Sequence, residues 1–230
     1  MVSEKYIAKL DESLWETCVP ILTKKNKFFF KSIIIDHSKR KKFANFFISR
    51  SLPYFNDIVA EISFNHCAKN FNNTTYLSDS IIQRSIETIN ILSGKKIKAE
   101  QLSCNELKDA LNLSKTLKKF LFSIGGHNSK FHPRLLGYGY LNSCHPDIIV
   151  KKILIEVKSS NYAYRLEDYR QIFLYYFLAI KNNLPIKTLI LVNPRFGEAL
   201  IINGFEYLEL MTQMTYSKAI NKLSRFLLAN

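Results

Sequence analysis

The chain has 230 residues, of which 47% are hydrophobic and 23% charged, with seven glycines and six prolines. This balance supports a sizeable core and excludes a disordered or collagen-like protein. With 33 basic and 19 acidic residues the formal net charge is +14, which favours a polyanionic partner, nucleic acid before a membrane surface. A basic protein that is merely kept soluble by its charge is the alternative.

The cysteines do not indicate a metal site. None forms a CxxC pair or has the spacing of a zinc ligand; they are Cys18, Cys67, Cys104 and Cys144. Scattered cysteines in a chain of this size favour a reducing compartment. The first residues lack the apolar core of a signal peptide, and no apolar run approaches the length of a membrane span. We therefore expect a soluble, intracellular protein of the cytoplasm without a membrane partner; a nuclear or organellar location is left open.

The first 124 residues are predicted to be mainly helical and to pack on a core formed by residues 125–230, within one structural domain. Ser3 to Cys18 has apolar residues at helical spacing and predicts an amphipathic helix. Phe28 to Ile35 is apolar and β-branched, which favours a strand or a buried segment. The phenylalanines Phe43, Phe46 and Phe47 that follow are interpreted as one face of a helix, in the core.

The densest charge run in the chain is Lys39-Arg40-Lys41-Lys42. It could contact a phosphate backbone, or act as a nuclear import signal, or begin a solvated helix. Lys39, Arg40, Lys41 and Lys42 are therefore candidate nucleic-acid-binding residues.

Three further helices are predicted before residue 125. The first runs from Asn56 to Phe71 and carries Glu61. The second runs from Leu77 to Leu92, with Ser78 or Asp79 as its N-cap and Gly94 at its end. The third begins at the capping box of Ser103 and Glu106 and continues to about Phe122.

The segment from His127 to Tyr140 connects these helices to the rest of the chain. It holds three basic candidates for nucleic-acid binding, Lys130, His132 and Arg134. They would lie near a scissile phosphate if the segment borders a cleft; an ordinary connection to a strand is the alternative. Gly137 to Leu141 could be the first strand of the sheet.

Two short apolar runs, Ile148 to Val150 and Ile153 to Val157, predict a tight hairpin, because only two lysines separate them. Side chains alternate along a strand, so Glu156 and Lys158 share one face. Asp147 opens the first strand and can lie beside Glu156. Two carboxylates in an apolar sheet need compensation, and oxygen ligands favour Mg²⁺, which often shares its shell with substrate phosphate.

A long helix is predicted from Tyr164 to Asn183, with Gln171 and Tyr175 four residues apart on one face. Strands follow at Thr188 to Val192 and at Ala199 to Ile202, and a final helix runs from Phe205 to Leu228. The order of elements predicts an α/β core with mixed strand directions, preceded by a helical layer.

The Pro146-Asp147 pair, followed after eight residues by Glu156-Val157-Lys158, resembles the signature of the PD-(D/E)XK nuclease superfamily. Gln171 and Tyr175 resemble the QxxxY element of its RecB-like exonuclease branch. The resemblance covers roughly Leu135 to Asn203 and implies a restriction-endonuclease-like core, a mixed central sheet flanked by helices.

The resemblance also implies site roles. Asp147, Glu156 and the Val157 carbonyl would bind Mg²⁺ or Mn²⁺, and Lys158 would position or deprotonate the attacking water. Gln171 and Tyr175 would support them from a second layer. An early helix often supplies another acid in this family, and Glu61 is the first candidate. Some RecB-like enzymes hold an iron–sulfur cluster with three late cysteines; this chain has none after Cys144, so no cluster is expected.

The expected function is metal-dependent hydrolysis of phosphodiester bonds in DNA, with RNA left open as a substrate because the chemistry does not require a deoxyribose. The QxxxY element tilts the expectation toward end processing of single strands, in repair or defence. A restriction or phage-defence endonuclease, or a junction-cleaving dimer, would carry the same residues, so endo and exo attack, and assembly into a homodimer or larger complex, stay open. The sequence also fits a catalytically silent nucleic-acid-binding module of the same fold, or a subunit whose basic surface meets an acidic partner.

Overall fold

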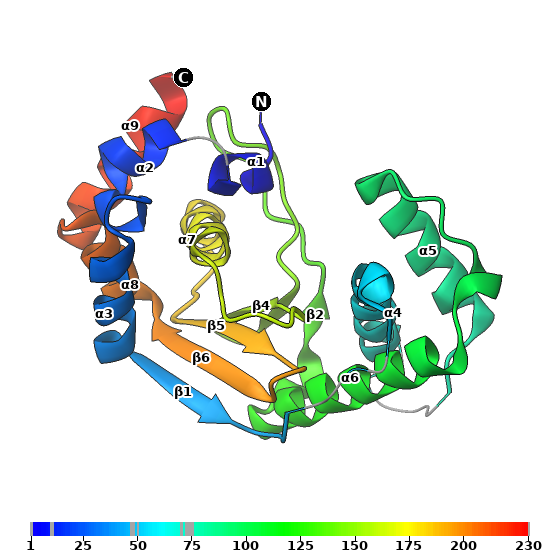
Figure 1. Cartoon of the computed structure of the whole chain (residues 1–230). Coiled ribbons are helices and arrows are strands. Elements are labelled where there is room, and N and C mark those ends of the chain that lie inside the picture. Colours follow the sequence, from blue (N-terminus) through cyan, green and yellow to red (C-terminus); the bar gives the residue numbers. More distant parts are fainter. Residues whose placement is uncertain are drawn as a thin grey trace.

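The computed structural model describes residues 2–9, 12–46, 49, 51–69, 71 and 76–229. In this part of the chain, strands form one open sheet in the order β1-β6-β5-β4-β3-β2, with helices on both faces (Figure 1). The predicted α/β class and the mixed sheet flanked by helices are therefore confirmed.

The strands are β1 (Ser38–Lys42), β2 (Lys130–Phe131), β3 (Ile148–Val150), β4 (Ile153–Val157), β5 (Thr188–Asn193) and β6 (Glu198–Asn203). The helices before β2 are α1 (Glu4–Lys9), α2 (Glu12–Cys18), α3 (Lys27–His37), α4 (Asn56–Lys69), α5 (Asp79–Ser93) and α6 (Cys104–Ser123). Those after β4 are α7 (Leu166–Lys181), α8 (Gly204–Thr212) and α9 (Tyr216–Ala229). The short 3-10 turns are η1 (Pro20–Leu22), η2 (Pro53–Phe55), η3 (Ala99–Gln101) and η4 (Gly126–Asn128).

The sheet is built around the predicted hairpin. Strands β3 and β4 pair antiparallel with Ile148 opposite Ile155, and Lys151 at the turn has a left-handed φ of 54°. Strand β4 then pairs parallel with β5, and α7 makes the crossover between them. Strand β6 returns antiparallel to β5. Two parallel neighbouring strands need a crossover connection of this kind, and here α7 connects the end of β4 to the start of β5.

The two faces of the sheet bury different sets of side chains. One face packs under α7 and the N-terminal and C-terminal helices; its strand residues include Ile149, Leu154, Leu189, Leu191, Leu200 and Ile202. The other packs on α4 and α6; its strand residues include Ile148, Val150, Ile155, Ile190 and Val192. A separate apolar cluster joins α4, α5 and α6 to one another, on the right of Figure 1.

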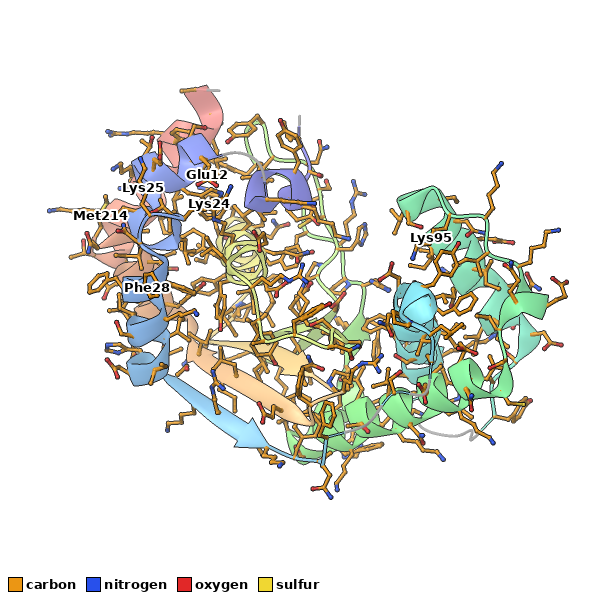
Figure 2. The ribbon with its side chains drawn as sticks, viewed as in Figure 1. Glu12, Lys24, Lys25, Phe28, Lys95 and Met214 are labelled. Atoms are coloured by element: carbon orange, nitrogen blue, oxygen red, sulfur yellow. The ribbon has the colours of Figure 1, made fainter. Side chains whose placement is uncertain are left out.

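Helix α7 is fixed to the N-terminal helices by a buried arginine. The Arg170 guanidinium binds both carboxylate oxygens of Glu12, at 3.0 and 2.7 Å, and donates to the Leu22 carbonyl at 2.7 Å. It also lies over the ring of Trp15. Glu12 pairs with Lys24 at 3.5 Å, and Figure 2 shows these two side chains close together. The helices α1 and α2 therefore hold α7 at a defined position over the sheet.

The predicted strand at Phe28 to Ile35 is wrong, because these residues lie in α3. Phe30 and Ile34, one helical turn apart, are buried, and the Phe30 ring packs 4.7 Å from that of Tyr169. Phe28 is 85% exposed and lies on the outside of the molecule (Figure 2). Because almost every residue of the run is apolar, its sequence carries no period that distinguishes a helix from a strand.

The basic run does not begin a helix, which was one of the three interpretations of its sequence. Lys39 to Lys42 belong to β1, which pairs with β6 and forms an edge of the sheet. Lysines on an edge strand discourage pairing with another chain. Phe43 and Phe46 lie outside helices and pack on Phe120 and on the β5–β6 turn, while Phe47 lies outside the described residues.

Other boundaries differ from the prediction. Gly137 to Leu141 forms a turn, not a strand, and the strand beside β3 is β2. The predicted final helix is two helices, separated at Gln213, whose φ is left-handed at 56°. The helix expected from Ser3 to Cys18 corresponds to α1 and α2, and Leu10 and Asp11 between them lie outside the described residues. None of the helices described is both long and apolar enough to cross a bilayer.

The β5–β6 turn provides a stability test. Gly197 has φ +63°, and an added Cβ would lie 2.3 Å from the Ala44 carbonyl oxygen. Gly94 has φ +68° but open space around it. We expect Gly94→Ala to cost about 1–2 kcal/mol from the left-handed backbone alone. Gly197→Ala should cost about 1–3 kcal/mol more, because the backbone must shift.

Urea unfolding of both variants measures this difference. Equal destabilisation would contradict the close approach of segment 43–46 to the turn.

Candidate active site

Three charged residues meet where β4 ends. Glu156 and Lys158 lie on the face of β4 that looks toward α7, and the Lys158 Nζ is 3.0 Å from Glu156 Oε1. Asp147, just before β3, accepts a hydrogen bond from the Val157 N–H at 2.7 Å. The structure therefore brings together the two carboxyl groups and the ammonium group of the sequence motif.

The electrostatics of this cluster are those of a buried site. Burial, and then the charge of Asp147, raise the pKa of Glu156 to about 8, although Lys158 opposes the shift. Burial also raises the pKa of Asp147, against the Val157 amide and Lys158. Burial would lower the pKa of Lys158, but Glu156, Asp168 and Asp147 outweigh it and raise that pKa. Lys158 therefore stays charged and can orient a water or an anion, but it is a poor proton acceptor in this arrangement.

The cluster has oxygen atoms that suit a hard divalent cation. Glu156 Oε2 is buried and has no hydrogen-bond partner among the described residues. The Lys158 N–H bonds to β5 through the Val192 carbonyl, whereas the Val157 N–H points the opposite way, to Asp147. Since the N–H and C=O of a strand residue point to the same side, the Val157 carbonyl points to the side of β4 on which Asp147 lies.

No group of three or more His, Cys, Asp and Glu side chains converges on a possible metal position in the part of the chain that the structure describes. One or two carboxylates completed by water and substrate phosphate are, however, the usual protein ligands of Mg²⁺. Asp147, Glu156 and the Val157 carbonyl fit that donor set.

The predicted pair on α7 is connected directly to Lys158. The Lys158 ammonium donates to Gln171 Oε1 at 2.7 Å, and Gln171 Nε2 donates to the Tyr175 hydroxyl oxygen at 2.8 Å. Tyr175 in turn donates to Glu4 Oε1 at 3.2 Å. Gln171 and Tyr175 are buried, so their face of α7 looks inward to the charged cluster and not to solvent.

Two acids that contact the chain of hydrogen bonds from Lys158 through Gln171 to Tyr175 were not among the predicted site residues. Asp168 Oδ1 lies 3.3 Å from Lys158 Nζ, and its other oxygen accepts the Arg165 N–H at the start of α7. An acid in the first turn of a predicted helix is a signal that could have identified it. Glu4 is buried on the same face of α1 as Ile7 and Ala8, and no local pattern marks this acid as part of a site.

The strand-to-helix connection after Lys158 is held by the β5–β6 turn. Asn193 Nδ2 donates to the Ser160 carbonyl at 3.0 Å, and Arg195 Nε donates to the Ser159 carbonyl at 3.1 Å. Both residues are buried. The backbone that carries Lys158 is therefore fixed from a neighbouring turn.

The predicted basic contacts fall into two separate groups. Lys130, His132 and Arg134 are exposed and lie at or just after β2. The basic run of β1 lies at the opposite edge of the sheet. The first group adjoins the charged cluster, since the His132 N–H donates to the Asp147 carbonyl at 2.9 Å. Although the residue as a whole is exposed, its imidazole is partly shielded from water; this desolvation lowers the pKa of His132, and the charges of Glu61 and Glu156 oppose the shift.

Glu61 lies on α4, where its carboxylate accepts a hydrogen bond from Asn65 at 3.0 Å. The negative charges of Glu61 and Glu156 both raise the pKa of His132, against the effect of desolvation. A role for Glu61 as a further metal ligand stays a prediction.

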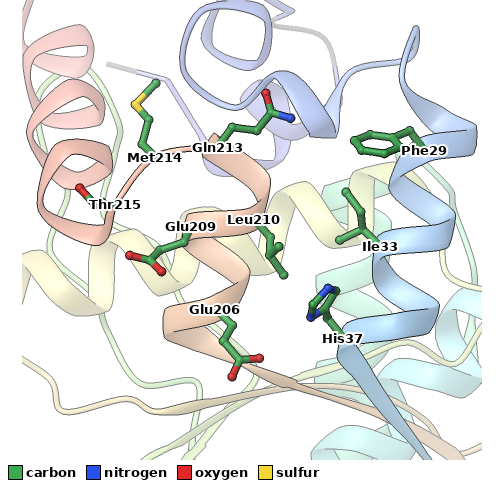
Figure 3. Close-up of a pocket in the computed structure, with 9 residues that line it drawn as sticks. All are labelled: Phe29, Ile33, His37, Glu206, Glu209, Leu210, Gln213, Met214 and Thr215. Carbon is green, nitrogen blue, oxygen red and sulfur yellow. The ribbon is translucent and has the colours of Figure 1, made fainter.

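A pocket lies elsewhere, between α3 and α8. Leu210 and Ile33 point toward each other across it (Figure 3). None of its lining residues belongs to the charged cluster; they are Phe29, Ile33, His37, Glu206, Glu209, Leu210, Gln213, Met214 and Thr215. The pocket is therefore separate from the candidate active site.

Comparisons with protein-family models, with curated proteins and with solved structures found no match to this chain.

The raised pKa of Glu156 predicts a pH dependence of stability. The folded state keeps the Glu156 proton up to about pH 8, whereas the unfolded chain loses it near the ordinary value of 4.5. The resulting stabilisation is full below pH 4.5 and is lost as the pH rises to about 8. In metal-free buffer, the melting temperature should therefore fall more steeply over this window for the wild type than for Glu156→Gln.

Thermal unfolding of both proteins at a series of pH values tests this. Parallel curves would mean that Glu156 ionises normally.

Proposed function

We propose that the chain is a metal-dependent nuclease with a restriction-endonuclease-like core, and that it hydrolyses phosphodiester bonds of DNA. The observation that carries the proposal is the buried cluster of Asp147, Glu156 and Lys158, with Gln171 bound to the lysine. The order of α6, β2, the hairpin, α7, β5 and β6 supports it, since it is an α/β core of mixed strand direction.

The residues of the cluster have distinct roles in this proposal. Asp147, Glu156 and the Val157 carbonyl would hold Mg²⁺ or Mn²⁺. When bound, such a cation lowers the pKa of a coordinated water and offsets the charge that builds on the phosphate. Lys158 is held charged by its carboxyl neighbours and can orient the water or neutralise a phosphate oxygen.

A basic stripe on α6 supports a nucleic-acid substrate. Lys108, Lys115 and Lys119 are exposed, and their spacing of seven and four residues places them on one face of the helix. The two acids of α6, Glu106 and Asp109, are buried and accept hydrogen bonds from Ser49, Ser51, Leu52 and Ser103. The outer face of α6 is therefore positive, as a phosphate backbone requires.

Cleavage of labelled single-stranded DNA, double-stranded DNA and RNA tests the proposal. We expect cleavage of DNA with Mg²⁺ or Mn²⁺ and none with EDTA. Lys158→Met should lower kcat by a factor on the order of 10²–10⁴. The matched control is Lys152→Met at the exposed hairpin turn, which should cleave normally.

Cleavage that survives both EDTA and Lys158→Met would overturn the mechanism. DNA binding without cleavage under any metal would instead identify a binding module. Circular against linear substrates separates endo from exo attack.

The α6 stripe predicts a salt dependence. Substituting Lys108, Lys115 and Lys119 by Gln should weaken DNA binding and lower the slope of log affinity against log salt by about 2 to 3. The control is a triple variant in which Gln replaces Lys31, Lys187 and Lys218, three exposed lysines that lie outside α6. Fluorescence anisotropy at several salt concentrations measures both slopes; equal slopes in the two triple variants would remove α6 from the interface.

A further inference from the structure

Helix α1 contributes a buried acid to the network around Lys158. Glu4 is 7% exposed, and its Oε1 accepts the Tyr175 hydroxyl hydrogen at 3.2 Å. The helix is held by backbone bonds between Val2 and the segment 140–142, and by the Trp15 indole, which donates to the Ile7 carbonyl. Glu4 is therefore placed by several independent contacts.

The direction of each hydrogen bond in the network is set by its two ends. The Lys158 ammonium can only donate, so Gln171 must turn its carbonyl oxygen toward it. The Gln171 NH₂ then faces Tyr175, whose hydroxyl oxygen must accept. The Tyr175 hydrogen is left for the acceptor on its other side, which is Glu4. Burial raises the pKa of Tyr175, and nearby carboxyl groups raise it further, so the hydroxyl keeps this hydrogen.

Without an acceptor at position 4, this order is no longer enforced. The Tyr175 hydroxyl could then donate to the Gln171 carbonyl oxygen, and the amide would rotate to allow it. A rotated amide presents its NH₂ group to Lys158, and two donors cannot form a hydrogen bond. The ammonium would lose the partner that fixes its position beside Glu156.

We propose that Glu4 is a positioning residue: by accepting the Tyr175 hydroxyl hydrogen, it fixes the Gln171 amide and thereby the orientation of the Lys158 ammonium. The catalytic part of this inference rests on the proposed nuclease function. The role needs an acceptor at position 4, not a negative charge and not a metal ligand.

Two substitutions of similar size separate these possibilities. Glu4→Gln keeps an oxygen that can accept from Tyr175, whereas Glu4→Met removes every acceptor. We expect Glu4→Met to lower kcat about 10- to 100-fold with little change in KM, because the residue supports a catalytic group and does not bind substrate. Glu4→Gln should retain most of the wild-type kcat.

Tyr175→Phe breaks the same network one step closer to Lys158 and should resemble Glu4→Met. The double variant Glu4→Met with Tyr175→Phe should be no worse than either single variant, because both remove one connection. Thermal unfolding verifies that each variant is folded.

A second readout does not depend on activity. In ¹⁵N-labelled protein, the side-chain amide resonances of Gln171, assigned by their loss in Gln171→Met, should stay in place in Glu4→Gln and shift or broaden in Glu4→Met. Unchanged Gln171 resonances in Glu4→Met would overturn the inference, as would equal loss of kcat in both Glu4 variants. If the wild type cleaves nothing, the nuclease proposal fails, and the Gln171 resonances still decide the role of Glu4.

Discussion

Two carboxyl groups and one ammonium group share a buried site at the end of β4, and the cost of burying them constrains the surrounding structure. Burial raises the pKa of Glu156 and of Asp147, and the carboxyl groups keep Lys158 charged. Buried charges are tolerated only when partners surround them. Helix α7 supplies two of these partners, Asp168 and Gln171, from its first two turns. A crossover helix whose other side chains are mostly apolar thus also completes a polar site.

The N-terminal helices matter for the same reason. The half-buried ion pair between Arg170 and Glu12 fixes α7 against α2, one residue before Gln171. The hydrogen bonds from Arg170 lower the pKa of the Glu12 carboxyl group. Burial raises this pKa by less, so the pKa is lowered overall. Helix α1 then reaches the network through Glu4 and Tyr175. Residues near the N-terminus therefore help to fix the position of Lys158, although more than 140 residues separate them from it in sequence.

Local sequence patterns were enough to predict much of the candidate active site. The hairpin was predictable because two β-branched runs flank two lysines, and the alternation of strand side chains placed Glu156 and Lys158 on one face. The spacing of Gln171 and Tyr175 gave their common face. Long-range contacts were not predictable: Glu4 and Tyr175 are 171 residues apart in sequence, and nothing in the local sequence of α1 indicates their contact. The prediction for Phe28 to Ile35 failed because six of its eight residues are apolar, which leaves no readable period.

The proposed mechanism requires the two carboxyl groups to hold a divalent cation, and calorimetric titration of metal-free protein with Mn²⁺ tests this most directly. Because the pKa of Glu156 is raised to about 8, binding at pH 7 should release a proton, which buffers of different ionisation enthalpy detect. Asp147→Asn and Glu156→Gln should each abolish the site. Binding that is unchanged in both variants, or no binding by the wild type, would contradict the account.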